Sequence, residues 1–173
     1  MFNKVIFRKV IIINILVLIL LLLIIKPIGF NGVLLLVLFQ IFYIIKQYLK
    51  THGHEIAFDL GFVFGVCAAY YSGIILAFII FLLSIYNRYS FKDYKTRHIS
   101  KIFRHVPLFV IVYFLRFYKF TYVAILVLSI NYAIKYIYLT IKKKVAEKSF
   151  YHVINFSLSI IFFYVIDYVF RLI

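Results

Sequence analysis

The chain of 173 residues is 66% apolar and only 14% charged, whereas soluble domains average about half apolar and a quarter charged, so an ordinary soluble domain is excluded. Its 20 Lys and Arg against five Asp and Glu lie mostly between long apolar runs, where the positive-inside rule and attraction to anionic lipid explain them, so no nucleic-acid partner is expected. We therefore predict an all-α, polytopic transmembrane helical bundle that forms one integral-membrane domain over residues 1–173.

The first predicted span covers residues 8–25 and ends at Lys26-Pro27, because proline stops a helix from continuing through it. No small-residue cleavage site follows the apolar run, so we interpret it as an uncleaved span. A second span is predicted at 32–46, and a polar link leads from it to the next apolar region.

Residues 56–86 are too many for one upright span and few for two full spans. Ser72-Gly73 lies in the middle and is a turn signal. We therefore predict a hairpin of two short helices that breaks there, with one long kinked helix as the alternative.

Small residues recur every four positions in the first half of this hairpin, which makes one smooth stripe on a helix. The other apolar segments carry mainly bulky side chains, which lipid tails match equally well. We expect the stripe to be the hub of the fold and a contact for partner helices. Its residues are Ala57, Gly61, Gly65, Ala69 and Gly73.

The segment 88–105 is the most basic part of the chain. Ile99, Ile102, Phe103 and Val106 follow helical spacing, so one face would be apolar and the other basic. This predicts an amphipathic helix in the membrane interface, with a solvated basic loop as the alternative. The residues expected to meet anionic lipid are Lys92, Lys95, Arg97, Lys101 and Arg104.

Residues 106–141 form either two spans, 104–117 and 120–141, or one long tilted span. Arg116-Phe-Tyr-Lys119 would be the turn between the two. A polar loop at 142–148 precedes a last span at 150–171, so the total is six or seven spans. The bias of basic residues favours two spans in this region and a cytoplasmic N-terminus in the cell inner membrane.

The polar link contains His52, His54 and Glu55, which are residue types that bind transition metals. His98 and His105, expected on the same side, would have to complete such a site. The simpler interpretation is a solvated loop whose acidic residues begin a helix, where the dipole favours them.

Asp167 lies inside the last span, where an ionisable group is costly unless it is paired. Lys135 and Arg116 are the expected partners in an ion pair. Common hydrolase, phosphate-binding and zinc-protease motifs are missing, so we predict no catalytic residue, no cofactor and no enzymatic activity.

The order of features from residues 27 to 105 resembles MreD, a small membrane protein of the bacterial rod-shape system. A span ending at Pro27 is followed by the apolar run 33–39, a polar link, the helix Glu55–Gly65 and a closing Tyr71-Ser72-Gly73. The usual acidic residue after the second glycine is missing here. The resemblance implies a non-catalytic scaffold in cell shape and peptidoglycan elongation, with MreC-like and other membrane proteins as partners.

Two alternatives remain. The short-helix pattern is also similar to substrate-binding S-components of transporters, which would require a polar cavity around Asp59, Tyr70, Tyr71 and Asp167. The first span lacks the Ala-x-x-x-Ala surface typical of that family. The second alternative is a metal-dependent membrane enzyme that uses His52, His54 and Glu55.

Overall fold

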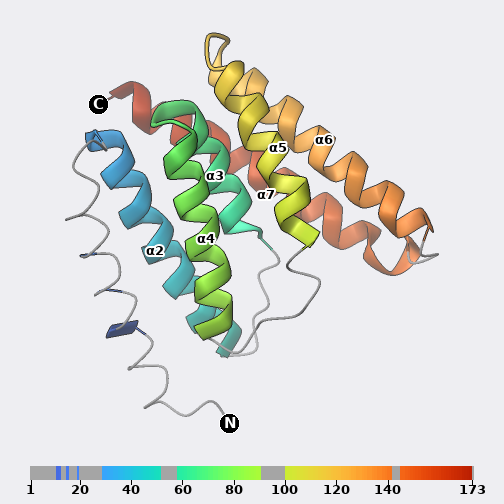
Figure 1. Cartoon of the computed structure of the whole chain (residues 1–173). Coiled ribbons are helices and arrows are strands. Elements are labelled where there is room, and N and C mark those ends of the chain that lie inside the picture. Colours follow the sequence, from blue (N-terminus) through green and yellow to red (C-terminus); the bar gives the residue numbers. More distant parts are fainter. Residues whose placement is uncertain are drawn as a thin grey trace.

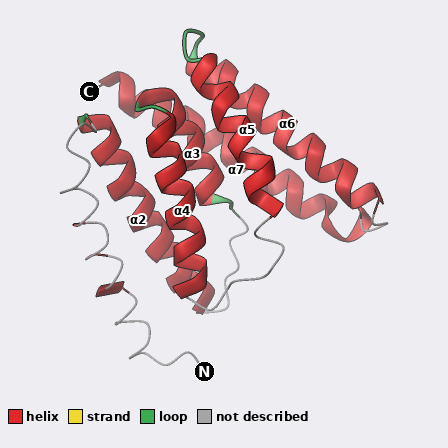
Figure 2. Ribbon diagram, in the orientation of Figure 1, coloured by secondary structure: helices red, strands yellow, loops and turns green. Residues whose placement is uncertain are grey.

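The computed structural model contains helices and no strand in the part of the chain that it describes, which confirms the all-α prediction (Figure 2). It describes residues 11, 12, 15, 19, 29–51, 58–90, 100–141 and 145–172. The helices with defined bounds, coloured along the chain in Figure 1, are α2 (Phe30–Thr51), α3 (Leu60–Tyr71), α4 (Ile74–Ser90), α5 (Ser100–Phe114), α6 (Phe120–Ile141) and α7 (Val145–Leu172).

Three of the described helices are long and apolar enough to cross a membrane, and these are α2, α6 and α7. The prediction of six or seven spans is therefore wrong for the part described. Helices α3, α4 and α5 have 12, 17 and 15 residues, whereas an upright span needs about 20. The predicted first span at 8–25 lies mostly outside the described residues.

Helix α3 lies at the centre and packs against α2, α4, α5, α6 and α7. Its residues from Leu60 to Ala69 are all buried, so it is apolar on every side. Two glycines allow the closest approaches: a Cβ built on Gly61 would lie 2.5 Å from Ser84 Cβ of α4, and one on Gly65 would lie 2.7 Å from Phe109 Cε1 of α5. The small residues of α3 are thus used inside this bundle.

The break between α3 and α4 lies at Ser72-Gly73, as the sequence predicted. The backbone N–H groups of Ser72 and Gly73 both bond to the carbonyl of Ala68, at 2.9 and 2.8 Å. Gly73 has φ +103°, a conformation that L side chains rarely adopt, and this reverses the chain. The single kinked helix is therefore excluded.

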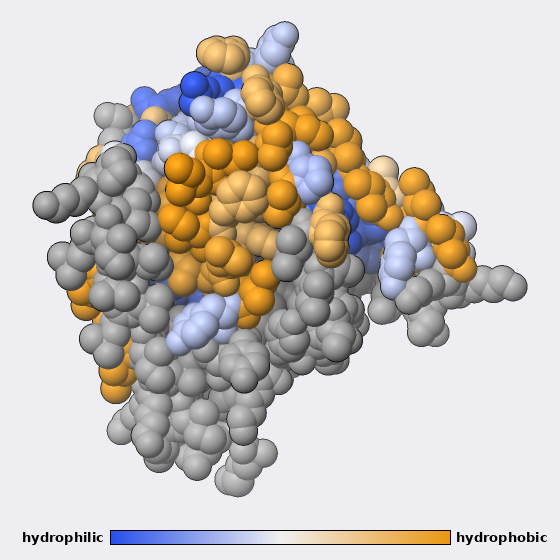
Figure 3. Space-filling view, viewed as in Figure 1, coloured by the Kyte–Doolittle hydropathy of each residue, from blue (hydrophilic) through white to orange (hydrophobic). Residues whose placement is uncertain are grey.

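A second break, at 115–119, separates α5 from α6 and confirms two helices between 106 and 141. This loop, the α3–α4 turn and the start of α2 lie at the same end of the bundle (Figure 1). Hydrophilic side chains gather at that end in Figure 3, while apolar side chains cover much of the described surface below it. Apolar flanks between polar ends suit a helical protein in a bilayer.

Candidate functional site

A group of charged side chains lies at the end of the bundle where α3 begins. Asp59 is the N-cap residue of α3, but its side chain makes no capping hydrogen bond. Its Oδ2 instead accepts a hydrogen bond from Lys101 Nζ of α5 at 2.8 Å. The two side chains are 17% and 23% exposed, so this ion pair is largely shielded from solvent and couples α3 to α5.

Helix α5 contributes two further basic residues from the same face, because Lys101, Arg104 and His105 are spaced i, i+3 and i+4. Arg104 Nη2 lies 3.2 Å from His105 Nε2. Since arginine can only donate, His105 Nε2 is the acceptor and its proton is assigned to Nδ1. His105 is fully buried, with its ring centroid 4.8 Å from that of Phe62.

Helix α6 adds Lys135, which is close enough to interact electrostatically with Asp59, Lys101 and Arg104. Its ammonium lies 4.2 Å from the centre of the Tyr132 ring. We call the group from α3, α5 and α6 the Asp59 cluster. It consists of Asp59, Lys101, Arg104, His105 and Lys135.

Several buried polar atoms in and beside the Asp59 cluster have no hydrogen-bond partner within the described residues. They are Arg104 Nε, His105 Nδ1 and both side-chain amide atoms of Asn131. Asn131 is fully buried and lies one helical turn before Lys135, on the same face of α6. Buried polar groups are normally hydrogen-bonded, so these atoms have unused capacity to bind a ligand or water.

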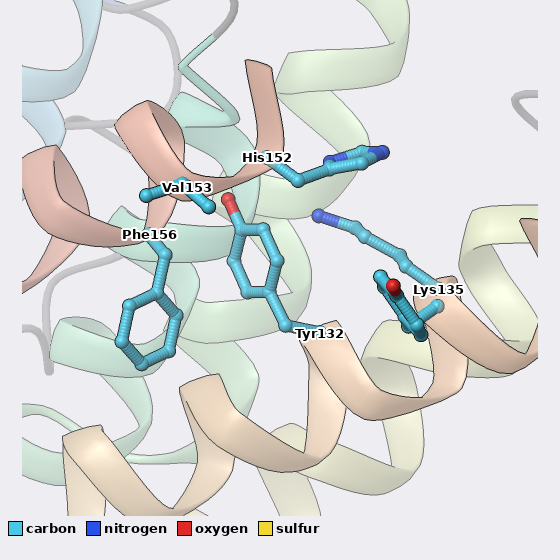
Figure 4. Close-up of a pocket in the computed structure, with 6 residues that line it drawn as sticks. Tyr132, Lys135, His152, Val153 and Phe156 are labelled. Atoms are coloured by element: carbon cyan, nitrogen blue, oxygen red, sulfur yellow. The ribbon is translucent and has the colours of Figure 1, made fainter. Parts of the chain in front are cut away.

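An open groove of about 310 Å³ lies between α6 and α7, and Lys135 of the Asp59 cluster is part of its lining. In Figure 4, Tyr132 and Lys135 extend from α6 toward α7, and His152 extends from α7 on the other side. The rest of the lining is mainly apolar or aromatic. We call it the α6–α7 groove, and its residues are Tyr132, Lys135, Tyr136, His152, Val153 and Phe156.

The second carboxylate cluster lies at the other end of α3. Asp167 of α7 accepts hydrogen bonds from Tyr71 at 2.8 Å and Thr121 at 2.9 Å. It also forms an ion pair with Arg171 at 2.9 Å. We call these four residues the Asp167 cluster. Its carboxylate joins α3, α6 and α7 and has donors for both oxygens.

The predicted pairing of Asp167 with Lys135 or Arg116 is wrong. Lys135 is 14 residues beyond Thr121 on α6, so about 21 Å of helix separates it from Asp167. Arg116 instead stacks on the Tyr113 ring, with its guanidinium carbon 4.6 Å from the ring centre. Arg171 is the partner because it follows Asp167 by one turn of the same helix.

A second opening, of about 420 Å³, lies beside the Asp167 cluster at the α3–α4 turn. Arg116, Tyr70, Tyr71 and the start of α2 at Phe30 contribute to its lining. Tyr70 donates a hydrogen bond to the Tyr118 carbonyl at 2.6 Å, and Tyr71 bonds to Asp167. The cavity residues expected for an S-component therefore lie at two separate ends, with Asp59 far from the other three.

Lys101 and Arg104, which were predicted to meet anionic lipid, contact Asp59 and His105 in the structure. Their contact with lipid stays a prediction. Phe103, which was expected on the apolar face of an interfacial helix, is 80% exposed. Helix α5 continues from Ser100 into an apolar segment that packs on α3. This packing sets the rotation of α5 about its axis and therefore the direction of these side chains. Lys92, Lys95 and Arg97 lie outside the described residues.

Some of the remaining predicted residues lie inside the bundle, and the others lie outside the described part of the chain. Gly61, Gly65 and Ala69 are buried inside the bundle, and Gly73 forms the turn. Ala57, His52, His54 and Glu55 lie outside the described residues. Within the described part, no three His, Cys, Asp or Glu side chains gather as metal ligands.

Comparisons with protein-family models, with curated proteins and with solved structures found no match.

Sequence reasoning considered Asp59, Lys101, Arg104, His105 and Lys135 separately and missed that they form one cluster. A signal was available on α6, where Asn131 and Lys135 are polar residues four positions apart in an apolar run. Such spacing places both on one helix face and indicates a polar contact. Nothing local in the sequence indicated that α5 would present its basic face to Asp59.

Proposed function

We propose that this chain is a non-catalytic, polytopic membrane protein that binds an anionic ligand at the Asp59 cluster. The observation that carries the proposal is an excess of cations with unused donors. Among its described residues the cluster has three basic side chains, Lys101, Arg104 and Lys135, for one carboxylate. Unpaired buried donors lie beside them on Arg104, His105 and Asn131, and an anion would satisfy such donors.

The ends of the bundle differ in charge in a way that supports an orientation. Lys46 and Lys50 near the end of α2 and the basic residues of the Asp59 cluster belong to one end. Arg116, Lys119 and Arg171 belong to the other. The positive-inside rule places the more basic end in the cytoplasm, so the cell inner membrane is the proposed location.

The test is a calorimetric titration of the purified protein in neutral detergent with inorganic phosphate. We expect saturable binding that falls at least tenfold in Lys135→Met. Lys119→Met is the matched control, because Lys119 lies at the opposite end of α6 and should bind as the wild type does. Absence of binding, or equal losses in both variants, would contradict the proposal.

A scaffold in cell-shape control is the second candidate. The observation that favours it is the α3–α4 hairpin, which occupies the residues that carry the MreD resemblance. Because Gly61 and Gly65 pack internally, a partner such as an MreC-like protein would have to contact another surface. Co-purification of the intact chain with an MreC-like protein is the test, and failure to co-purify would remove this candidate.

A further inference from the structure

We propose that the anion bound at the Asp59 cluster is the phosphate group of an amphiphile whose acyl or prenyl chain lies in the α6–α7 groove; this rests on the function proposed above. The proposal joins two features that share one residue. Lys135 belongs to the Asp59 cluster and also lines the groove. A ligand whose phosphate contacts Lys135 would therefore have the groove beside it.

The groove is suited to an apolar chain. Val153 and Phe156 of α7 and the rings of Tyr132 and Tyr136 of α6 supply most of its lining. Val153 is 63% exposed and Tyr136 52%, so the groove is open on its outer side. Both flanking helices are candidate spans, and an opening between two spans faces lipid. An amphiphile would enter sideways from the bilayer.

The position along the helices is suited to a phosphate headgroup. Lys135 precedes the end of α6 at Ile141 by six residues, or about 9 Å of helix. His152 faces the groove from near the start of α7 (Figure 4). The polar part of the site therefore lies close to the end of two spans, where headgroups meet the hydrocarbon region. Lys and Arg side chains can extend toward such groups.

The chemistry of the unpaired donors favours phosphate over a zwitterionic headgroup. Arg104, His105 and Lys135 offer several N–H groups within one cluster, and phosphate has oxygens enough to accept from all of them. A choline group would bring a second positive charge toward Lys101 and Lys135. Phosphatidic acid should therefore bind, and phosphatidylcholine should not.

The experiment compares three probes on the full chain in neutral detergent: inorganic phosphate, dihexanoyl phosphatidic acid and dihexanoyl phosphatidylcholine. We expect phosphatidic acid to bind at least tenfold more tightly than inorganic phosphate and phosphatidylcholine to show no specific binding. Val153→Trp should fill the groove, so phosphatidic acid should lose that tenfold advantage while phosphate binding is unchanged. Val165→Trp is the control, because Val165 is a 53% exposed residue of the same helix outside the groove.

The outcomes separate the two proposals. If phosphate binds and phosphatidic acid binds no more tightly, a free phosphate is the ligand and the amphiphile proposal is overturned while the anion site stands. If phosphatidylcholine matches phosphatidic acid, the groove recognises chains without the phosphate, which also overturns it. If neither phosphate nor phosphatidic acid binds, the anion site itself fails. Equal losses in the two tryptophan variants would show that the groove is not the site.

Discussion

The two carboxylate clusters lie at opposite ends of α3, separated by about 18 Å of helix, and they differ in how far their polar groups are paired. In the Asp167 cluster, two hydroxyl groups and a guanidinium donate to one carboxylate. In the Asp59 cluster, one carboxylate lies among three cations, and buried donors nearby have no partner in the described residues. A cluster whose polar groups are all hydrogen-bonded stabilises the fold, whereas a cluster with unpaired donors has capacity to bind a ligand.

Helix α3, which joins the two clusters, is buried from Leu60 to Ala69. The helix presents Gly61 to α4 and Gly65 to α5, which brings helices from both halves of the chain close together. Substitutions in the two clusters and in the helix between them should therefore have different effects.

Replacing Asp167 with Asn should give the largest loss of stability. The change removes the charge that three donors share, and hydrogen bonds to a charged group contribute more than neutral ones, so we expect a loss of about 3 kcal/mol. Thermal unfolding in detergent measures it. Phosphate binding at the Asp59 cluster should be unchanged in the folded variant, and a parallel loss of binding would show that the two clusters are not independent.

Gly65→Leu should cost about 2 kcal/mol through overpacking, because the new side chain would meet the Phe109 ring. The same unfolding measurement applies. Gly29→Leu is the control, since a Cβ at exposed Gly29 has nothing within 4 Å. Adding Phe109→Ala to Gly65→Leu should restore part of the loss. If the double variant is no more stable than Gly65→Leu alone, the new leucine clashes with a residue other than Phe109.

Tyr71→Phe should cost about 1 kcal/mol, the contribution of one hydrogen bond. It removes the bond to Asp167 and keeps the ring, which stacks on Phe170 with centroids 4.6 Å apart. Tyr122→Phe is the matched control, because Tyr122 is 69% exposed. Equal stability of the two variants would mean that the hydrogen bond from Tyr71 to Asp167 does not stabilise the fold.

Asp59→Asn should strengthen an interaction, namely the binding of phosphate, whereas the three substitutions above should weaken the fold. Removing the one described carboxylate of the Asp59 cluster makes its net charge more positive, so we expect phosphate to bind about threefold more tightly, or about 0.7 kcal/mol. Calorimetric titration measures the change. Weaker binding would indicate that Asp59 positions Lys101 for the ligand.

The positions of the chain breaks could be predicted because they depend on local chemistry. Ser72-Gly73 ends α3 through a positive φ at Gly73, and Arg116–Lys119 interrupts a run of apolar residues. The number of spans could not be predicted as well. Apolar helices of 12 to 17 residues look like spans in a hydropathy pattern, but α3 is covered by other helices of the same chain.

For the charged residues too, one part of the outcome could be predicted from the sequence and another part could not. The sequence alone indicates that Asp167 needs a partner and that Lys101 and Arg104 lie on one helix face. It does not indicate that Arg171 is that partner, that Lys101 meets Asp59 across 42 positions, or that Lys135 lies near Lys101 and Arg104. These outcomes depend on the rotation of α5 and α6 about their axes, which local spacing does not specify.

By itself, then, the sequence determined that the chain is helical, apolar and basic at one set of loops, because backbone hydrogen bonding and hydrophobicity act over a few neighbouring residues. Only the tertiary structure decided which polar groups meet. Each cluster combines side chains from three helices, and the close contacts of Gly61 and Gly65 set the register between them. A shift of one turn in that packing would separate Asp59 from Lys101 and leave both charges to find other partners.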